Sequence, residues 1–217
     1  MPDDAAFLAE QTAPRGRAQW LAAILRERLW NGVYRPGHWI REHALRTEFG
    51  FSNGPVREAL QALVAEGLLE RVPYSGIRVA TLTDAQIVEL FQLRLALLEL
   101  AAELAARRAS PAALAQADEV IDGARQNWAD GTRPFTGHLM QWLVDASGNE
   151  ALAKSWTKLA SQSRMYVYEA VRRAADPALY AEKLVAHVVA GDAAAAREAV
   201  RSLTRQQIRD LGLELVL

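Results

Sequence analysis

Polar and basic residues lie beside an apolar helical face in the stretch FSNGPVREAL, residues 51–60. They are Ser52, Asn53, Gly54 and Arg57, and the apolar positions next to them recur at helical spacing. A guanidinium can clamp a phosphate or a guanine through two parallel hydrogen bonds, and the unpaired N–H groups at a helix start also attract a phosphate. The stretch therefore predicts recognition of anions and base edges, although Ser52 can equally cap the helix.

Catalytic chemistry has little support in the rest of the sequence. The chain has no cysteine, which excludes disulfides and thiolate nucleophiles or metal ligands, and it has only four histidines. It shows no Ser-His-Asp arrangement, no glycine-rich phosphate loop and no paired-carboxylate motif. An enzyme that acts on a small molecule is therefore kept only as a minor alternative.

The elements that must position residues 51–60 follow one another in an informative order. Periodicity and turn signals predict a helix, a turn, a short helix, a longer helix and a β-hairpin with a Pro-Tyr-Ser-Gly tip. Their ranges are 17–30, 33–40, 41–50, 52–66 and 68–82. This order is typical of a winged helix-turn-helix, whose second paired helix enters the major groove of DNA. We assign the domain to residues 17–81, after a flexible arm formed by residues 1–16.

From Thr83 onward the pattern is helical to the end of the sequence. Six helices are predicted, at residues 84–108, 111–128, 135–146, 150–173, 177–190 and 193–211. The short breaks between them favour an antiparallel all-α bundle. The predicted fold is mostly α: a winged helix-turn-helix with a small β-hairpin wing, followed by a helical domain over residues 82–217.

Charge is distributed unevenly between these two parts. Residues 17–80 contain nine arginines and six glutamates, whereas the whole chain has a formal charge of −1. Because salt screens charges beyond roughly 8–10 Å, the local excess of positive charge matters more than the total for binding DNA. No leader and no run of about 18 uncharged apolar residues is visible, so we expect a cytoplasmic protein without membrane contact.

Several motifs along the chain resemble the signatures of one family of bacterial regulators. The N-terminal motifs, within residues 32–68, are GVYRPG, EHAL, SNGPVREAL and EGL. The C-terminal motifs, within residues 93–196, are LRLALLELAA, ASGN and GDAAAA. In this order and at this spacing they resemble the GntR family of transcription regulators, in the subgroup with a FadR-type C-terminal (FCD) domain.

The resemblance implies a regulator, with repression as the expected outcome, that binds a palindromic site in double-stranded DNA as a homodimer. It also implies that a small-molecule effector enters the helical domain and changes the affinity for DNA. A dimeric regulator that has no effector response, and uses the bundle only to dimerise, is the alternative. A fully packed bundle interior would favour this alternative, and an open cavity would favour sensing.

The resemblance also implies DNA contacts on three elements. Arg57 matches the arginine of the family signature, and His43 matches a frequent polar contact on the short helix. Arg78, near the hairpin tip, has an equally good alternative as the partner of Glu70 across the hairpin. The full candidate set is Arg41, His43, Ser52, Asn53, Gly54, Arg57, Ser75, Gly76 and Arg78.

Asn53 and Gly54 depart from the family pattern, which has arginine and threonine at these positions. An arginine that reads a base is worth roughly 1–3 kcal/mol of discrimination. Asn53 can instead pair with adenine. We therefore expect an altered or weaker operator preference, with DNA binding retained.

Many relatives hold a divalent metal in the bundle through one aspartate and three histidines. Counting from the ASGN and GD motifs, the corresponding positions are Thr136, Met140, Ala181 and Leu203, none of which is a ligand of the expected kind. His138 and His187 fall on other faces of their helices at about 100° per residue, and a shifted two-histidine site is the alternative. We predict no family-type metal and no cofactor.

Without a metal, an effector must be held by other groups. Arg94 matches the family arginine that faces the pocket and can hold an acid group. Its alternative is a buried or interface salt bridge with Glu99, Glu103 or another acid. Aromatic residues on the bundle helices, including Trp156 and Tyr166, allow an aromatic-lined pocket or simply pack the core. The candidate effector residues are Arg94, Thr136, Met140, Trp142 and Tyr168. We expect an apolar or aromatic effector, with one acid group as an option.

Overall fold

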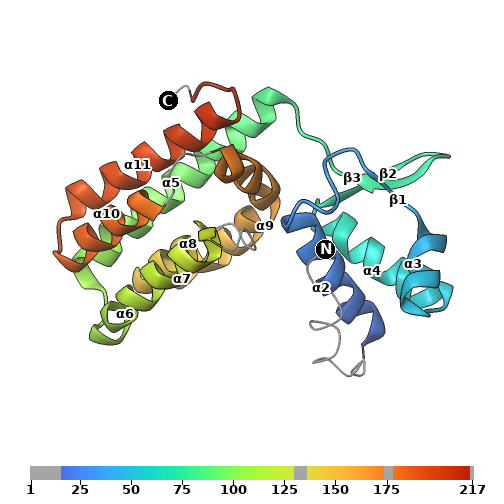
Figure 1. Cartoon of the computed structure of the whole chain (residues 1–217), viewed down its shortest axis with the longest axis horizontal. Coiled ribbons are helices and arrows are strands. Elements are labelled where there is room, and N and C mark those ends of the chain that lie inside the picture. The colour runs from blue at the N-terminus through green and yellow to red at the C-terminus, as the bar shows by residue number, and fades with distance from the viewer. Residues whose placement is uncertain (1–15, 130–135, 174–177, 216–217) are drawn as a thin grey trace. The chain divides into compact units, whose positions relative to one another are not determined.

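The chain forms two compact units in the computed structural model, which describes residues 16–129, 136–173 and 178–215. The first unit ends at Thr81 and the second begins at Leu82. In the described residues, the first unit contains three helices and three short strands, and the second unit is helical (Figure 1). The predicted fold class, a winged helix-turn-helix followed by an all-helical domain, is confirmed.

Three helices build the core of the first unit: α2 (Arg17–Trp30), α3 (Glu42–Phe49) and α4 (Asn53–Ala65). Both α2 and α3 pack against α4, because the apolar residues of each helix recur on one face. The buried side chains of this core include Leu21, Leu25, Leu29, Leu45, Val56, Leu60 and Leu63. Gly50 ends α3 with a φ of 64°, a left-handed conformation that glycine adopts without steric cost. This residue allows the sharp turn from α3 into α4.

A small antiparallel sheet completes the first unit in the order β1 (Trp39–Ile40), β3 (Gly76–Val79), β2 (Leu69–Val72). The β2–β3 hairpin is the predicted wing, with Glu70 opposite Arg78. The β1 strand corrects the prediction of a simple turn over residues 33–40, since Trp39 pairs with Arg78 and Ile40 with Ile77. The β1 strand forms because one edge of β3 offers unpaired backbone N–H and C=O groups. The two strands are far apart in the sequence, so local patterns do not indicate this pairing.

Seven helices make up the described part of the second unit. They are α5 (Asp84–Arg108), α6 (Pro111–Ala115), α7 (Ala117–Ala129), α8 (Thr136–Ala146), α9 (Glu150–Arg173), α10 (Ala178–Val189) and α11 (Ala193–Asp210). The split between α6 and α7 corrects the prediction of a single helix over residues 111–128. The N–H of Gln116 bonds to the carbonyl of Ala113, which tightens the turn and interrupts the helix.

The α5 helix packs against α8, α9 and α11, and it runs alongside α11 in Figure 1. Its buried alanines, Ala101, Ala102 and Ala105, have no exposed surface beyond about one per cent, as expected where neighbouring helices approach closely. Two ion pairs set the register between the helices: Arg201 with Glu99 at 2.6 Å and Arg197 with Glu103 at 3.4 Å. The two helices are therefore antiparallel.

The ASGN and GD motifs have structural roles at the ends of these helices. Arg108 donates to the carbonyl of Ser147 at 2.8 Å, which ties the end of α5 to the turn between α8 and α9. Asn149 accepts a hydrogen bond from the N–H of Leu152 at 3.1 Å, and Asp192 caps α11 by accepting from Ala195 at 2.9 Å. Within the described ranges, no helix is both long enough and apolar enough to span a bilayer.

Candidate DNA-binding surface and effector site

The start of α4 presents its polar residues to solvent. Asn53, Gly54 and Arg57 are exposed, while Val56 and Leu60 on the opposite face are buried. Ser52 occupies the N-cap position, yet its hydroxyl makes no cap hydrogen bond. The alternative that Ser52 acts as a side-chain cap is therefore wrong, and the first N–H groups of α4 are left for an external acceptor such as phosphate.

Arg57 is held in place by the preceding helix. Its Nε donates to Oε2 of Glu42 on α3 at 3.0 Å, while 64% of the Arg57 side chain stays exposed. An exposed ion pair of this kind adds at most about 1 kcal/mol to stability. The pair uses one of the five N–H donors of the guanidinium. Glu42 therefore orients Arg57 and leaves its terminal nitrogens for a ligand.

Arg41 and Arg78 flank the ring of Trp39 near the base of the wing. Their guanidinium carbons lie 5.8 and 5.9 Å from the ring centroid, within cation–π range. Arg78 also donates to Glu70 at 2.7 Å, so the alternative role as a hairpin partner is what the structure shows. His43 lies in the first turn of α3 and is exposed.

The tip of the wing carries an exposed aromatic residue that was not among the predicted contacts. Tyr74 is completely exposed and has a φ of 61°, which is unfavourable for a residue with a Cβ atom. Ser75 and Gly76 beside it are exposed as well, and Gly76 has a φ of 115°. An aromatic residue in the predicted hairpin tip was the signal that could have identified Tyr74 from the sequence.

Arg94 on α5 is a buried cation, with 3% of its surface exposed. Its Nη1 donates to Oγ of Ser163 on α9 at 3.2 Å, and its guanidinium lies 4.7 Å from the ring centroid of Trp156. Its Nε has no hydrogen-bond partner among the described residues. Burial without a carboxylate lowers the pKa of Arg94 to about 9, so it is still charged at neutral pH.

The structure contradicts a salt bridge of Arg94 with Glu99 or Glu103 within the chain, whereas a salt bridge across an interface stays a prediction. Glu99 pairs with Arg201 at 2.6 Å, and Glu103 pairs with Arg107 at 2.9 Å. No carboxylate in the described part of the chain pairs with Arg94. A buried charge without a counter-ion costs several kcal/mol, and an anionic ligand beside it would offset this cost.

Other buried polar residues lie on α11, at the same height along the bundle as Arg94. The ion pairs between α5 and α11 place Arg94 opposite residues 204–207, where Thr204 and Gln207 are buried. Nε2 of Gln207 has no hydrogen-bond partner among the described residues. Ser163, Thr204 and Gln207 were not predicted. Helical periodicity assigns these three positions to a buried face, where apolar residues are expected. A polar residue at such a position was the signal that the sequence offered.

The remaining candidate effector residues are distributed over different surroundings. Met140 and Trp142 lie in the same buried apolar cluster as Trp156, and Nε1 of Trp142 donates to the carbonyl of Ala113 at 2.9 Å. Tyr168 is half-buried and belongs to neither apolar cluster of the described second unit. The side chain of Thr136 lies outside the described residues.

The positions of the family metal ligands do not fit a metal ion. Met140, Ala181 and Leu203 are buried members of the apolar cluster, and none has a side chain that binds a divalent cation. His138 is exposed and His187 is half-buried on α10. In the ranges that the structure describes, no group of three His, Asp or Glu side chains is arranged to hold a metal.

The two units together define a class: a winged helix-turn-helix DNA-binding protein with an all-helical second domain. The model of bacterial regulatory proteins of the gntR family matches residues 17–79, and the model of the FCD domain matches residues 89–206. The chain belongs to the GntR family of transcription regulators, in the subgroup that carries an FCD domain. It is a DNA-binding regulator and not an enzyme.

Relatives and solved structures agree with this assignment. The HTH-type regulator YdhC of Bacillus subtilis (strain 168) is 31% identical over a match that spans 59% of each chain. The protein named "Probable D-xylose utilization operon transcriptional repressor" of Paenarthrobacter nicotinovorans is 30% identical over 70% of this chain and 76% of its own. McbR/YncC of E. coli shares the fold, with a TM-score of 0.76 and 22% identity over 90% of this chain and 97% of that one.

Proposed function

We propose that the protein is a repressor that binds a palindromic operator as a homodimer and responds to a small effector held in the bundle beside Arg94. The observation that carries the effector role is the burial of the Arg94 charge without a carboxylate. The ligand that suits this site is an aromatic or apolar molecule with one acid group. Its body can pack against the ring of Trp156, and its acid group can accept hydrogen bonds from the unpartnered N–H donors of Arg94 and Gln207. Repression is supported by the name of the Paenarthrobacter relative.

The effector site functions without a metal in this proposal. The apolar side chains at three of the family ligand positions support this, because they supply no ligand atom. The guanidinium of Arg94 takes over the task of neutralising the acid group of the effector. Its planar donors can bind both oxygens of a carboxylate at once.

DNA binding is assigned to α4, the start of α3 and the wing. Arg57, oriented by Glu42, contacts phosphate or guanine, and Ser52 with the first N–H groups of α4 contacts phosphate. Asn53 reads a base edge in place of the family arginine. Arg41, His43, Ser75, Gly76 and Arg78 make supporting contacts from the neighbouring elements.

A row of leucines on α5 supports the homodimer. Leu93 and Leu100 are 55% and 42% exposed, although both are large apolar side chains. Leu97 and Leu104 continue the row and are half-buried, at the spacing of a coiled-coil seam. A two-fold axis beside this face would bring the same leucines of a second copy against it, and a two-fold dimer matches the symmetry of a palindromic operator.

Effector binding must favour one arrangement of the two DNA-binding units over another. An effector changes DNA affinity only to the extent that its own affinity differs between the two states. The α5 helix carries both Arg94 and the leucine row, so an ion pair formed at Arg94 acts on the same helix that joins the two copies. This shared helix is the physical link between sensing and dimer geometry.

The proposal is tested with fluorescence anisotropy on labelled DNA from the promoter of its own gene. The protein is titrated with aromatic acids such as benzoate and phenylacetate, with benzamide and phenylacetamide as neutral counterparts. We expect at least one acid to weaken DNA binding about tenfold, its amide to have no effect, and Arg94→Met to remove the response while DNA affinity is kept. An equal response in Arg94→Met would contradict the site. No response to any monocarboxylic acid would favour a regulator without an effector.

A further inference from the structure

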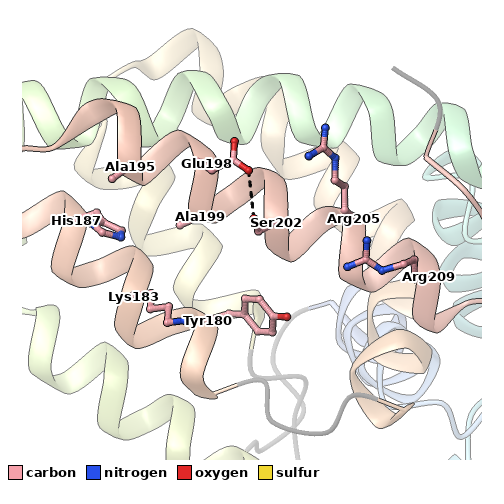
Figure 2. A pocket seen from close by; sticks show the side chains of 9 residues that line it. All are labelled: Tyr180, Lys183, His187, Ala195, Glu198, Ala199, Ser202, Arg205 and Arg209. Atoms are coloured by element: carbon pink, nitrogen blue, oxygen red, sulfur yellow. Dashed lines mark hydrogen bonds between the residues drawn. The ribbon is translucent and has the colours of Figure 1, made fainter.

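A groove runs between α10 and α11 on the surface of the second unit. Its volume is about 560 Å³, within the range of small-molecule sites. Its lining includes Lys183 and His187 on α10, and Arg205 and Arg209 on α11, all labelled in Figure 2. The groove is therefore lined by cationic or hydrogen-bonding groups from both helices.

Small side chains make room for the groove. Ala195, Ala199 and Ser202 follow one another along the face of α11 that lies beside α10. Tyr180 adds an aromatic ring near the start of α10, next to Lys183 in Figure 2. The floor of small residues leaves an open hollow between the two helices, with basic residues and one aromatic ring around it.

The basic side chains of the groove have no carboxylate partners among the residues that the structure describes. The side chains of Lys183, His187 and Arg205 form no ion pair or hydrogen bond within the described residues, and the side chain of Arg209 donates only to Gln206, at 2.7 Å. Glu198 is the single carboxylate of the lining, and it is already bound by Arg201 at 3.3 Å. It also accepts a hydrogen bond from Ser202, drawn in Figure 2. The free charge in the groove is therefore positive.

Other arginines of α11 provide an internal comparison for the groove. Arg197 and Arg201, which approach α5, are matched by Glu99 and Glu103. On the side that approaches α10, the nearby Glu182 is taken by Arg125 of α7 at 2.6 Å. Arg205 follows Arg201 by one helical turn, and unlike Arg201 it has no carboxylate partner among the described residues.

The groove is separate from the buried site at Arg94. The α10 helix turns Ala181, Leu184 and Val188 toward the core, whereas Lys183 and His187 lie on its other face. A ligand in the groove would therefore contact solvent and both helices without entering the bundle.

We infer that this groove is a second ligand site, which binds a small molecule with at least two negative charges. A phosphate ester and a di- or tricarboxylate share this chemistry. Lys183 and Arg205 supply the principal charge-assisted hydrogen bonds, Arg209 and His187 supply further donors, and Tyr180 packs against the body of the ligand.

Isothermal titration of the full chain with pyrophosphate and with citrate tests the inference. We expect saturable binding of one ligand per chain, weakened at least about tenfold in Lys183→Gln/Arg205→Gln, because each lost charged contact is worth a factor of this order. The matched control is Lys158→Gln, which removes an exposed, unpaired lysine of α9. Binding of pyrophosphate alone would show that the groove recognises phosphate groups. Binding of both anions would show that it recognises the number of negative charges on the ligand.

A second variant tests whether the anions bind inside the groove or only respond to the positive charge of the surface. Ala199→Phe fills the floor of the groove and changes no charge, so it should weaken binding as much as the double variant does. Unchanged binding in Ala199→Phe, or an equal loss in Lys158→Gln, would show that the anions associate with the surface without a site. Absence of saturable binding by either anion at millimolar concentration would also overturn the inference.

Discussion

Arg57 and Glu42 join the two helices of the helix-turn-helix, with Nε of Arg57 donating to Oε2 of Glu42 at 3.0 Å. The contact spans fifteen residues, and it leaves most of the guanidinium exposed. The contact therefore links α4, which carries Arg57, to α3, which carries Glu42. We expect this ion pair to matter for DNA recognition through the orientation of Arg57, because an exposed pair adds little to stability.

Arg57→Gln should lower affinity for promoter DNA by at least about tenfold and reduce its dependence on salt, because one phosphate or guanine contact is lost. Glu42→Gln should cause a smaller loss, since Arg57 keeps its charge but loses its orientation. Anisotropy titrations at several salt concentrations measure both effects. Arg107→Gln is the matched control, because Arg107 is 66% exposed and paired with a glutamate at 2.9 Å, as Arg57 is. A loss in the control equal to that in Arg57→Gln would contradict the assignment.

Restoring the family residues at the start of α4 should strengthen DNA binding. A side chain at Gly54 would meet no atom within 4 Å, so threonine fits there, and Asn53 is exposed. We expect Asn53→Arg/Gly54→Thr to raise affinity for a site with guanine at the contacted position about tenfold. Selection of preferred sequences from random DNA, for wild type and variant, measures the change. Identical preferences would show that residues 53 and 54 read no base.

The wing tip contains backbone strain that a single substitution can relieve. Tyr74 has a φ of 61°, and glycine occupies this region without the steric cost of a Cβ atom. Tyr74→Gly should therefore be more stable than Tyr74→Ala by about 0.5–1 kcal/mol, although both lose the same ring. Urea unfolding measures the difference. If the wing contacts DNA through the ring, both variants should lose a similar amount of DNA affinity.

Arg94 should make stability depend on alkaline pH. Burial lowers the pKa of Arg94 from its ordinary value to about 9. Below pH 9 both the folded and the unfolded states therefore carry the proton, and the full cost of burying the charge is present. Above about pH 9 the folded state releases a proton that the unfolded state still holds. The unfolding free energy of the wild type should then rise relative to Arg94→Met, by at most about 1.4 kcal/mol per pH unit. Urea unfolding at pH 7 and pH 10 measures this difference, and an equal difference at both pH values would contradict it.

The leucine row on α5 should control assembly. Leu93→Arg/Leu100→Arg places two like charges against their copies at a two-fold interface, so it should shift the protein to a monomer and abolish tight operator binding. Light scattering during gel filtration measures the mass. Val189→Arg is the control, because Val189 is a 51% exposed apolar residue on another helix. A dimer that survives the double substitution would place the interface elsewhere.

Most of the helices follow from local patterns in the sequence. Apolar periodicity, together with stops such as Gly50 and caps such as Asp192, predicted the ranges of α2 to α5 and α8 to α11 within about two residues. The motifs also indicated the family, because they record which residues a given fold needs at given positions. These features depend on neighbours within a few positions along the chain.

Other features were decided only by the tertiary structure, because they depend on contacts between residues that are distant in the sequence. Strand β1 exists because β3 borders it, and Arg57 is oriented by Glu42 from another helix. Arg94 was recognised from the sequence, but its placement on Trp156 and Ser163, rather than beside Glu99 or Glu103, follows from the packing of α9 against α5. The groove between α10 and α11 had no signal in the sequence. Periodicity tells which face of a helix is buried, whereas the identity of the neighbouring helix, and of the charges it brings, depends on how the whole bundle packs.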